Sequence, residues 1–245
     1  MMRISILALL AATGVMAASA DIPVAEFSAL GAGDALPAQW QPTELPGIER
    51  HTRYSLVEDN GVTVLRAESD RSMSSLLRRV DIDPAQHAWL QWRWRVDKLV
   101  EKASLDAKES DDFAARVYVL FDFDIAQLSF FERTRIRIAR ALYGGDLPLA
   151  ALCYVWATSE PVGTSAWNAF TDRVRVIVVS SGRNQLGQWL DIERDLAQDY
   201  RDAFGGKPPR ISGIVIASDS DNTGGQALAF FGDIRLSGTP RGKRP

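Results

Sequence analysis

The densest group of oxygen-bearing side chains lies in the segment 218–225, which reads Ser-Asp-Ser-Asp-Asn-Thr-Gly-Gly. Asp219, Asp221 and Asn222 can direct several hard oxygens towards one point, and Ca²⁺ takes about six to eight such ligands. This segment is therefore a candidate Ca²⁺ site, with Asp233 on the following strand as a further ligand. The alternative is a hairpin turn in which the Asp and Asn side chains cap their own backbone.

A second polar group is the acidic pair Asp111 and Asp112, which directly precedes an apolar run. Two carboxyl groups across a glycosidic bond, one protonated and one ionised, are the machinery of a glycoside hydrolase. The pair therefore allows a carbohydrate-active hydrolase or lyase. The alternative is a solvated acidic loop in which Asp112 pairs with a nearby arginine.

A third pattern is the alternation of arginine with apolar residues along predicted strands. In 89–96, Arg93 and Arg95 fall on the face opposite Trp92 and Trp94. If the arginine-bearing strands are neighbours, one sheet face gathers guanidinium groups beside aromatic rings, which suits an anionic glycan. The alternative is a solvated face of Arg–Asp/Glu pairs across strands. The candidate ligand-binding residues are Arg93, Arg95, Arg116, Tyr118, Trp156, Trp167, Arg173 and Arg175.

Several classes of site have no support in the sequence. The chain has two histidines and one cysteine, Cys153, and it contains no HExxH, Gly-x-Ser-x-Gly or phosphate-cradling glycine motif. A lone cysteine cannot form an intrachain disulfide, and its apolar neighbours predict a buried, inert thiol. The net charge of −3 does not favour nucleic acid as a partner.

The first twenty residues predict export. A short basic start is followed by an apolar run and then by Ala18-Ser19-Ala20, the small-x-small pattern that a signal peptidase reads. We expect 1–20 to be a signal peptide and the mature protein to be periplasmic or secreted. The rest of the chain has no second long apolar segment, so we expect no transmembrane span in the mature protein.

The remaining sequence predicts an all-β fold. Short apolar runs alternate with Gly, Pro, Asp and Asn, and Asn60-Gly61 between two such runs is a strong hairpin signal. We expect an antiparallel β-sandwich of jelly-roll type with two peripheral α-helices, at 126–143 and 191–204. The expected organisation is an extended lead-in over 21–46, a single sandwich domain over 47–237 and a flexible tail over 238–245. The expected strands cover 52–57, 62–67, 75–82, 89–96, 114–123, 149–157, 173–179, 211–217 and 226–236.

Several segments together resemble one family of exported bacterial proteins, the domain of unknown function 3047. The segments that carry this resemblance are 50–54 (RHTRY), 64–67 (VLRA), 90–96 (LQWRWRV), 111–119 (DDFAARVYV), 154–156 (YVW), 171–175 (TDRVR) and 219–225 (DSDNTGG). The resemblance implies no activity. The final strand, with Gly232-Asp233-Ile234, also resembles galactose-binding-like jelly rolls, which often bind sugars and a structural Ca²⁺.

Three hypotheses about function follow from the sequence. The first is non-catalytic binding of a glycan or envelope component by the arginine-bearing face. The second is a carbohydrate-active hydrolase or lyase that uses Asp111 and Asp112. The third is a structural or interaction protein of the cell envelope, with the basic segment 131–142 as its contact.

Overall fold

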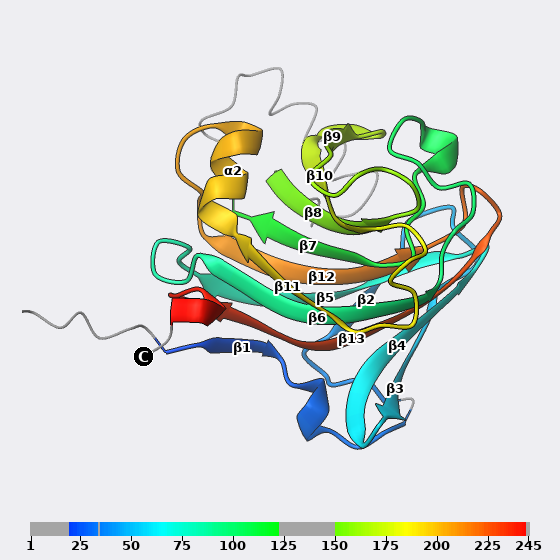
Figure 1. Cartoon of the computed structure of the whole chain (residues 1–245), viewed down its shortest axis with the longest axis horizontal. Coiled ribbons are helices and arrows are strands. Elements are labelled where there is room, and N and C mark those ends of the chain that lie inside the picture. The colour runs from blue at the N-terminus through cyan, green and yellow to red at the C-terminus, as the bar shows by residue number, and fades with distance from the viewer. Residues whose placement is uncertain (1–19, 34, 123–149, 244–245) are drawn as a thin grey trace, which may run out of the picture.

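The computed structural model describes residues 20–33, 35–122 and 150–243, and these form two β-sheets packed face to face (Figure 1). The fold is the predicted β-sandwich of jelly-roll type. Sheet A has the order β11-β6-β13-β4-β3, with β1 paired to β13, and sheet B has the order β2-β5-β12-β7-β8-β10-β9. The strands of sheet A are β1 (Ile22–Ala25), β3 (Arg53–Asp59), β4 (Val62–Asp70), β6 (Trp89–Lys98), β11 (Leu190–Asp195) and β13 (Gln226–Ser237). Those of sheet B are β2 (Gln41–Thr43), β5 (Met73–Ile82), β7 (Arg116–Phe121), β8 (Ala150–Ala157), β9 (Ser165–Asn168), β10 (Thr171–Ser181) and β12 (Ile211–Asp219).

The hairpin between β3 and β4 forms where the Asn-Gly pair predicts it. Asn60 and Gly61 take positive φ angles of 52° and 79°, the left-handed conformations that a two-residue hairpin turn requires. β3 and β4 then pair in register from Asp59↔Val62 to Arg53↔Glu68. The turn residues and the strand pattern therefore specify the same structure.

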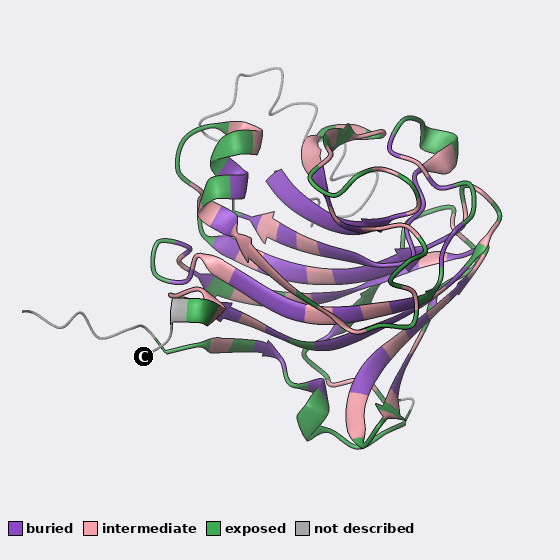
Figure 2. Cartoon of the chain, viewed as in Figure 1, coloured by how far each residue is buried: buried purple, intermediate pink, exposed green. Residues whose placement is uncertain are grey.

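The core lies between the sheets and is rich in aromatic rings. Trp92 and Trp94 of β6 are fully buried, and they meet Tyr154 and Trp156 of β8 at ring-centroid distances of 5.4 and 6.2 Å. Buried rings of this size contribute much apolar area to a core. Figure 2 shows that buried positions run along the strands of both sheets.

Strand β8 is buried on both of its faces. Its inward residues join the main core, and its outward residues, including Cys153 and Val155, join a second apolar cluster with Phe113 and Val176. β8 pairs with β10 in parallel, whereas the other described strand pairs are antiparallel. An apolar run without alternation is typical of a strand covered on both faces. Burial raises the pKa of the Cys153 thiol to about 12, which keeps it protonated.

The expected helix over 191–204 is helical only from Leu196 to Phe204, as α2. Its first five residues form β11, which pairs with β6 from Leu190↔Trp94 to Asp195↔Trp89. Asp195 ends the strand and caps the helix, because its carboxylate accepts hydrogen bonds from the backbone N–H groups of Ala197 and Gln198. The expected helix over 126–143 lies outside the described residues.

The predicted lead-in contributes a strand to each sheet. β1 pairs with β13 and β2 pairs with β5, and the short 3-10 helix η1 (Phe27–Ala29) lies between them in the chain. Further 3-10 turns occur at η2 (Lys108–Ser110) and η4 (Arg241–Lys243). Among the described residues, no helix has the length and apolar character needed to cross a membrane.

Candidate functional site

Arg116 lies at the start of β7, where its side chain is 2% exposed and held by two carboxylates. Its Nε and Nη2 donate to the two oxygens of Asp219, at 2.8 and 2.5 Å, in a bidentate pair. Its Nη1 donates to Asp111 Oδ1 at 3.2 Å, and its Nη2 donates to the Asp111 carbonyl at 2.6 Å. Every part of this guanidinium is therefore engaged inside the protein, which makes Arg116 a structural ion-pair partner and not a residue that faces a ligand.

Asp112 is fully buried and holds the 219–225 loop in place. Its Oδ1 accepts hydrogen bonds from the backbone N–H and the Nδ2 of Asn222, at 3.2 and 3.1 Å. Its Oδ2 accepts from the backbone N–H and the Oγ1 of Thr223, at 2.7 and 2.6 Å. Asp111 is also buried, and its Oδ2 accepts from Asn168 Nδ2 at 2.6 Å. Because both carboxylates are buried and committed, the acidic pair of the hydrolase hypothesis is part of the structural frame.

Two aspartates close to this frame, Asp219 and Asp221, have raised pKa values. Burial raises the pKa of Asp219 to about 7, against the opposing effects of Arg116 and the Phe113 N–H. Burial also raises the pKa of Asp221, and the nearby charge of Asp112 adds to that rise. For Arg116, burial lowers the pKa, but Asp219, Tyr118 and Asp111 outweigh this effect and the pKa is raised.

The same carboxylates bear on the predicted Ca²⁺ site. One oxygen each from Asp112, Asp219 and Asp221 lies within 4.8 Å of the others, and Asp221 Oδ1 is buried without a hydrogen bond. The oxygens of Asp112 and Asp219 are, however, engaged by N–H and O–H donors, and Asn222 presents its amide nitrogen to this group. These hydrogen bonds disfavour a cation site and favour a capped turn, but the cap comes from Asp112 of another segment and not, as expected, from the Asp and Asn side chains of the loop itself. Asp233 is not part of the cluster, because it lies on sheet A and accepts hydrogen bonds from the N–H and the hydroxyl of Ser28.

The predicted arginine face is divided between the two sheets. Arg93 and Arg95 are on β6 of sheet A, whereas Arg116, Arg173 and Arg175 are on β7 and β10 of sheet B. The alternation along a strand predicts which face of that strand an arginine occupies, but it does not predict which strands are neighbours. The residues therefore do not form one surface.

The aromatic candidates are separated as well. Trp156 is fully buried against Trp94, and its Nε1 donates to the Gly182 carbonyl, so it is a core residue and not a stacking platform. Tyr118 is half-buried against the second apolar cluster. Trp167 on β9 is 40% exposed, with the Arg175 guanidinium 5.0 Å above its ring. Trp167 thus remains a surface residue, at the edge of sheet B.

The outer face of sheet A carries a row of alternating guanidinium groups and rings that we call the arginine–aromatic ledge: Phe230, Arg95, Trp189 and Arg93. Arg95 lies 4.2 Å from the Phe230 ring centroid and 5.3 Å from that of Trp189, and Arg93 lies 4.6 Å from that of Trp189. Such cation–π contacts favour a fixed guanidinium orientation.

Asp59 anchors one end of this ledge. Its carboxylate accepts hydrogen bonds from Arg95 Nη1 at 2.9 Å and from Trp189 Nε1 at 2.7 Å. These hydrogen bonds lower the pKa of Asp59, so the carboxylate is ionised and Arg95 is neutralised. Arg93, at the other end, forms no ion pair with any described residue.

Arg93 borders a pocket of about 400 Å³ on the outer face of sheet A. In it, Arg235 Nε donates to the fully buried Gln91 at 2.7 Å, and Arg241 Nη1 pairs with Asp191 at 2.6 Å. These contacts fix the guanidinium groups of Arg235 and Arg241 beside that of Arg93, which forms no ion pair with any described residue. The pocket is lined by Gln91, Arg93, Asp191, Asp233, Arg235 and Arg241.

Gly232 explains how Arg93 lies against the sheet. A Cβ atom at this position would stand 2.5 Å from Arg93 Nε and 2.6 Å from its Cγ, so the arginine crosses directly over the glycine. The pairing of β13 with β6 shifts between Phe231 and Ile234, which marks a β-bulge at the same place. The bulge interrupts the strict alternation of β13. Phe230 before it and Arg235 after it both lie on the outer face of sheet A, whereas Phe231 and Ile234 lie on the inner face, in the core.

Sequence reasoning missed Trp189, Gln91, Arg235 and Arg241. Gln91 and Arg235 lie on predicted strands. For Arg235, strict alternation along the strand would predict the inner face of the sheet, because it ignores the bulge that precedes this residue. The signal that could have located the bulge is Gly232, because an isolated glycine within a strand often marks a bulge or a close approach. Trp189 and Arg241 lie outside the predicted strands, where no periodicity places them.

Comparison with known proteins identifies the family. The family model described as "Protein of unknown function (DUF3047)" matches residues 38–235. The chain belongs to this family. None of the curated proteins compared with the chain matches it in sequence.

Solved structures with a similar fold include two carbohydrate-binding modules of Clostridium thermocellum cellulosomal cellulases. The family 30 module of Cel9D-Cel44B is 13% identical with a TM-score of 0.41, and the match covers 89% of this chain and 97% of that one. The family 11 module of Lic26A-Cel5E is 9% identical with a TM-score of 0.45, covering 91% and 97%. A cellulase derived from Cel12A of Rhodothermus marinus is 10% identical with a TM-score of 0.38, covering 88% and 100%.

Proposed function

We propose that this member of the DUF3047 family binds an acidic saccharide, or an envelope component that carries one, at the pocket beside Arg93. The observation that carries the proposal is the Arg93 guanidinium, which forms no ion pair with any described residue, although its charge helps to lower the pKa of Asp59. It lies over the Trp189 ring, and its side chain passes directly over Gly232. A planar guanidinium that is fixed and unpaired suits the two oxygens of a carboxylate.

The neighbouring groups supply the remainder of the recognition. Arg235 and Arg241 add positive charge, although each also pairs with a carboxylate, Asp21 at 3.7 Å and Asp191 at 2.6 Å. The exposed Asp191 carboxylate adds acceptors for hydroxyls, whereas Gln91 is buried and holds the Arg235 side chain in place. A pocket of about 400 Å³ is within the range of small-ligand sites, which starts near ~300 Å³. We place this binding outside the cytoplasm, in accord with the signal peptide predicted over residues 1–20.

Binding without turnover is the form of the proposal that the titratable groups favour. The carboxylates at this pocket are Asp191, which pairs with Arg241, and Asp233, which accepts two hydrogen bonds from Ser28. The acidic pair of the hydrolase hypothesis is buried in the connection that leads into β7 of the other sheet. The basic segment of the interaction-protein hypothesis, 131–142, lies outside the described residues.

The test is the melting temperature of residues 21–245 across neutral and acidic saccharides, followed by titration calorimetry with the best one. A shift confined to uronic acid or other carboxylated sugars is expected, because these offer the group that Arg93 lacks. Arg93→Ala is expected to abolish the shift. The matched control is Arg210→Ala, which removes an exposed arginine that pairs with Asp81 away from the pocket.

A second variant tests whether binding depends on where the Arg93 guanidinium lies, and not only on its charge. Gly232→Ala keeps every charge and introduces a Cβ into the space that Arg93 occupies. Gly232 does not have a positive φ, so alanine is compatible with the backbone and only the flexible arginine must move. Weakened binding with an unchanged melting temperature supports the proposal. Full binding by both Arg93→Ala and Gly232→Ala would refute it.

A further inference from the structure

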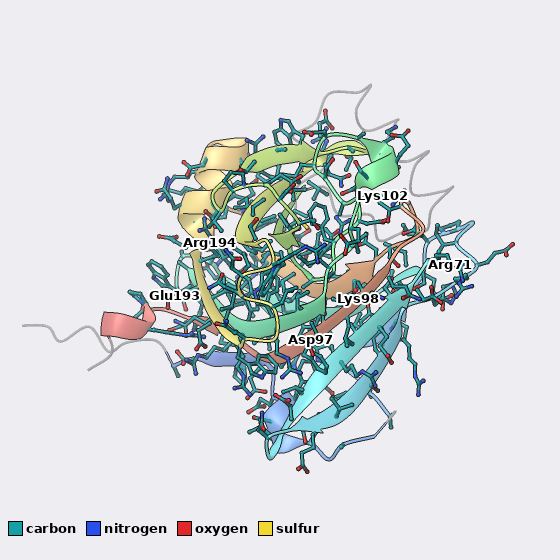
Figure 3. All side chains as sticks on the ribbon, turned by 45° about the vertical axis from the view of Figure 1, so that its right-hand side comes forward. Arg71, Asp97, Lys98, Lys102, Glu193 and Arg194 are labelled. Atoms are coloured by element: carbon teal, nitrogen blue, oxygen red, sulfur yellow. The ribbon has the colours of Figure 1, made fainter. Side chains whose placement is uncertain are left out.

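A second pocket, of about 440 Å³, lies at the end of the sandwich where three strand connections meet. The β4–β5 turn brings Arg71, the end of β6 and the turn after it bring Lys98 and Lys102, and the β12–β13 loop brings Gly224 and Gly225. Figure 3 shows the labelled Arg71, Lys98 and Lys102 around this end of the molecule, whereas the labelled Glu193 and Arg194 lie at the opposite side.

The acidic residues at this pocket are already paired with arginines: Asp70 with Arg50 and, at 3.4 Å, with Arg71 of the pocket itself, and Glu101 with Arg183, which does not line it. Asp70 accepts hydrogen bonds from Arg50 at 2.9 Å and from Gln226 at 3.2 Å. The two lysines are less committed: Lys98 donates to the neutral Gln226 Oε1, and Lys102 forms no ion pair with any described residue. The pocket therefore holds an excess of positive charge.

Backbone hydrogen bonds join the β4–β5 turn to the β12–β13 loop at this pocket. The Arg71 N–H donates to the Gly225 carbonyl at 2.9 Å, and the Ser220 N–H donates to the Ser72 carbonyl at 3.0 Å, so the two turns are joined. Arg71 takes a φ of 50°, a left-handed conformation that a residue other than glycine adopts uncommonly. The turn thus presents an arginine where its backbone would favour glycine.

We propose that this pocket binds a tetrahedral oxyanion, the phosphate or sulfate group of an ester. Lysine ammonium groups act as compact point charges that bind phosphate, and the guanidinium of Arg71 can pair with two oxygens of the same group. The site is on a different part of the molecule from the pocket of the proposed function and does not depend on it.

The experiment is an NMR titration of the ¹⁵N-labelled protein with inorganic phosphate and with sulfate at constant ionic strength. The expected result is saturable shifts of the amides of 98–102 and 223–226. Lys102→Gln and Lys98→Gln should each weaken the apparent affinity by about tenfold, because each removes a charge-assisted contact. Lys207→Gln, an exposed lysine after α2, is the matched control and should leave it unchanged.

Further arms identify the source of the ester. Glucose 6-phosphate, compared with glucose, tests a saccharide, and vesicles of phosphatidylglycerol in phosphatidylcholine test a lipid headgroup. Binding of either that is lost in Lys102→Gln and kept in Arg93→Ala supports the site and assigns its ligand. Unsaturable shifts, or equal weakening in Lys102→Gln and Lys207→Gln, would mean general charge screening and would overturn the proposal. Binding lost only in Arg93→Ala would assign the ligand to the other pocket and also overturn it.

Discussion

Arg116 at the start of β7 in sheet B and Arg93 on the outer face of sheet A carry the same charge in very different surroundings. Arg116 is 2% exposed and contacts the carboxylates of Asp219 and Asp111. Arg93 is half-buried, lies over an indole ring and has no carboxylate partner among the described residues. The comparison shows that arginine on an alternating strand has no fixed role. Its role depends on which carboxylates the topology brings to it.

The aspartates beside these two regions differ in the same way. Burial raises the pKa of Asp219 to about 7 although it has a bidentate arginine partner. Asp59, on the arginine–aromatic ledge, has its pKa lowered by hydrogen bonds from Arg95 and Trp189. Removal from water dominates in the first case and hydrogen bonding to the ionised form dominates in the second.

The largest expected effect distinguishes the two arginines by stability. Arg116→Met is expected to lower the free energy of unfolding by roughly 3–5 kcal/mol, because it leaves buried carboxylates without their partner. Arg93→Met is expected to cost less than about 1 kcal/mol, the scale of an exposed cation–π contact. Urea denaturation of both variants measures the difference, and equal losses would contradict the division into a structural and a recognition arginine.

The second prediction compares the aspartates by pH. Between about pH 4 and 7 the folded state keeps a proton at Asp219 that the unfolded state has lost, so this group lowers stability as the pH rises through that window. Asp59 acts with the opposite sign: it stabilises the fold above its ordinary pKa, and this contribution is lost as the pH falls below about 4.

Urea denaturation from pH 3 to pH 8 tests both signs. Asp219→Asn is expected to remove part of the decline in the free energy of unfolding between about pH 4 and 7. Asp59→Asn is expected to remove part of the decline in the same free energy as the pH falls below about 4. The comparison is of slopes, so a constant destabilisation by either variant does not obscure it. Curves parallel to that of the wild type in both variants would refute the opposite shifts.

The smallest expected effect concerns the 219–225 loop. Because Asp112 caps this loop with four hydrogen bonds, we expect the melting temperature to be the same in EDTA and in added Ca²⁺. A ligand that binds only the folded state would raise it. A rise with Ca²⁺ that Asp221→Asn abolishes would instead favour the cation site over the capped turn.

Local signals predicted much of the fold. The turn at Asn60-Gly61 and the alternation around Trp92 and Trp94 each correspond to the observed element. The predicted start of the helix at residue 191 is wrong. Ile192 and Leu196 fit a helical period, but Ile192 belongs to β11 and pairs with Trp92 of β6. Pairing with a distant strand overrides a short apolar pattern, and no local signal reveals it.

The site was less accessible to prediction than the fold. Arg93 was identified from alternation alone, but so was Arg116, and the sequence does not show that Asp111 and Asp219, which are 108 positions apart, both reach it. Trp189 reaches the arginine–aromatic ledge from the connection between β10 and β11, where no strand or helix periodicity predicts the direction of a side chain. Sequence periodicity tells which way a strand residue points, whereas its function depends on what the other strands bring alongside.

The pairing of β1 with β13 also has a consequence for the order of folding. Ile22 stands opposite Leu236, so the first and last strands of the described chain are neighbours in one sheet. Sheet A cannot be completed until nearly the whole polypeptide is available, and such long-range closure is slow compared with the formation of local hairpins. A chain that is synthesised from its N-terminus must therefore leave β1 unpaired until β13, the last strand, has been made.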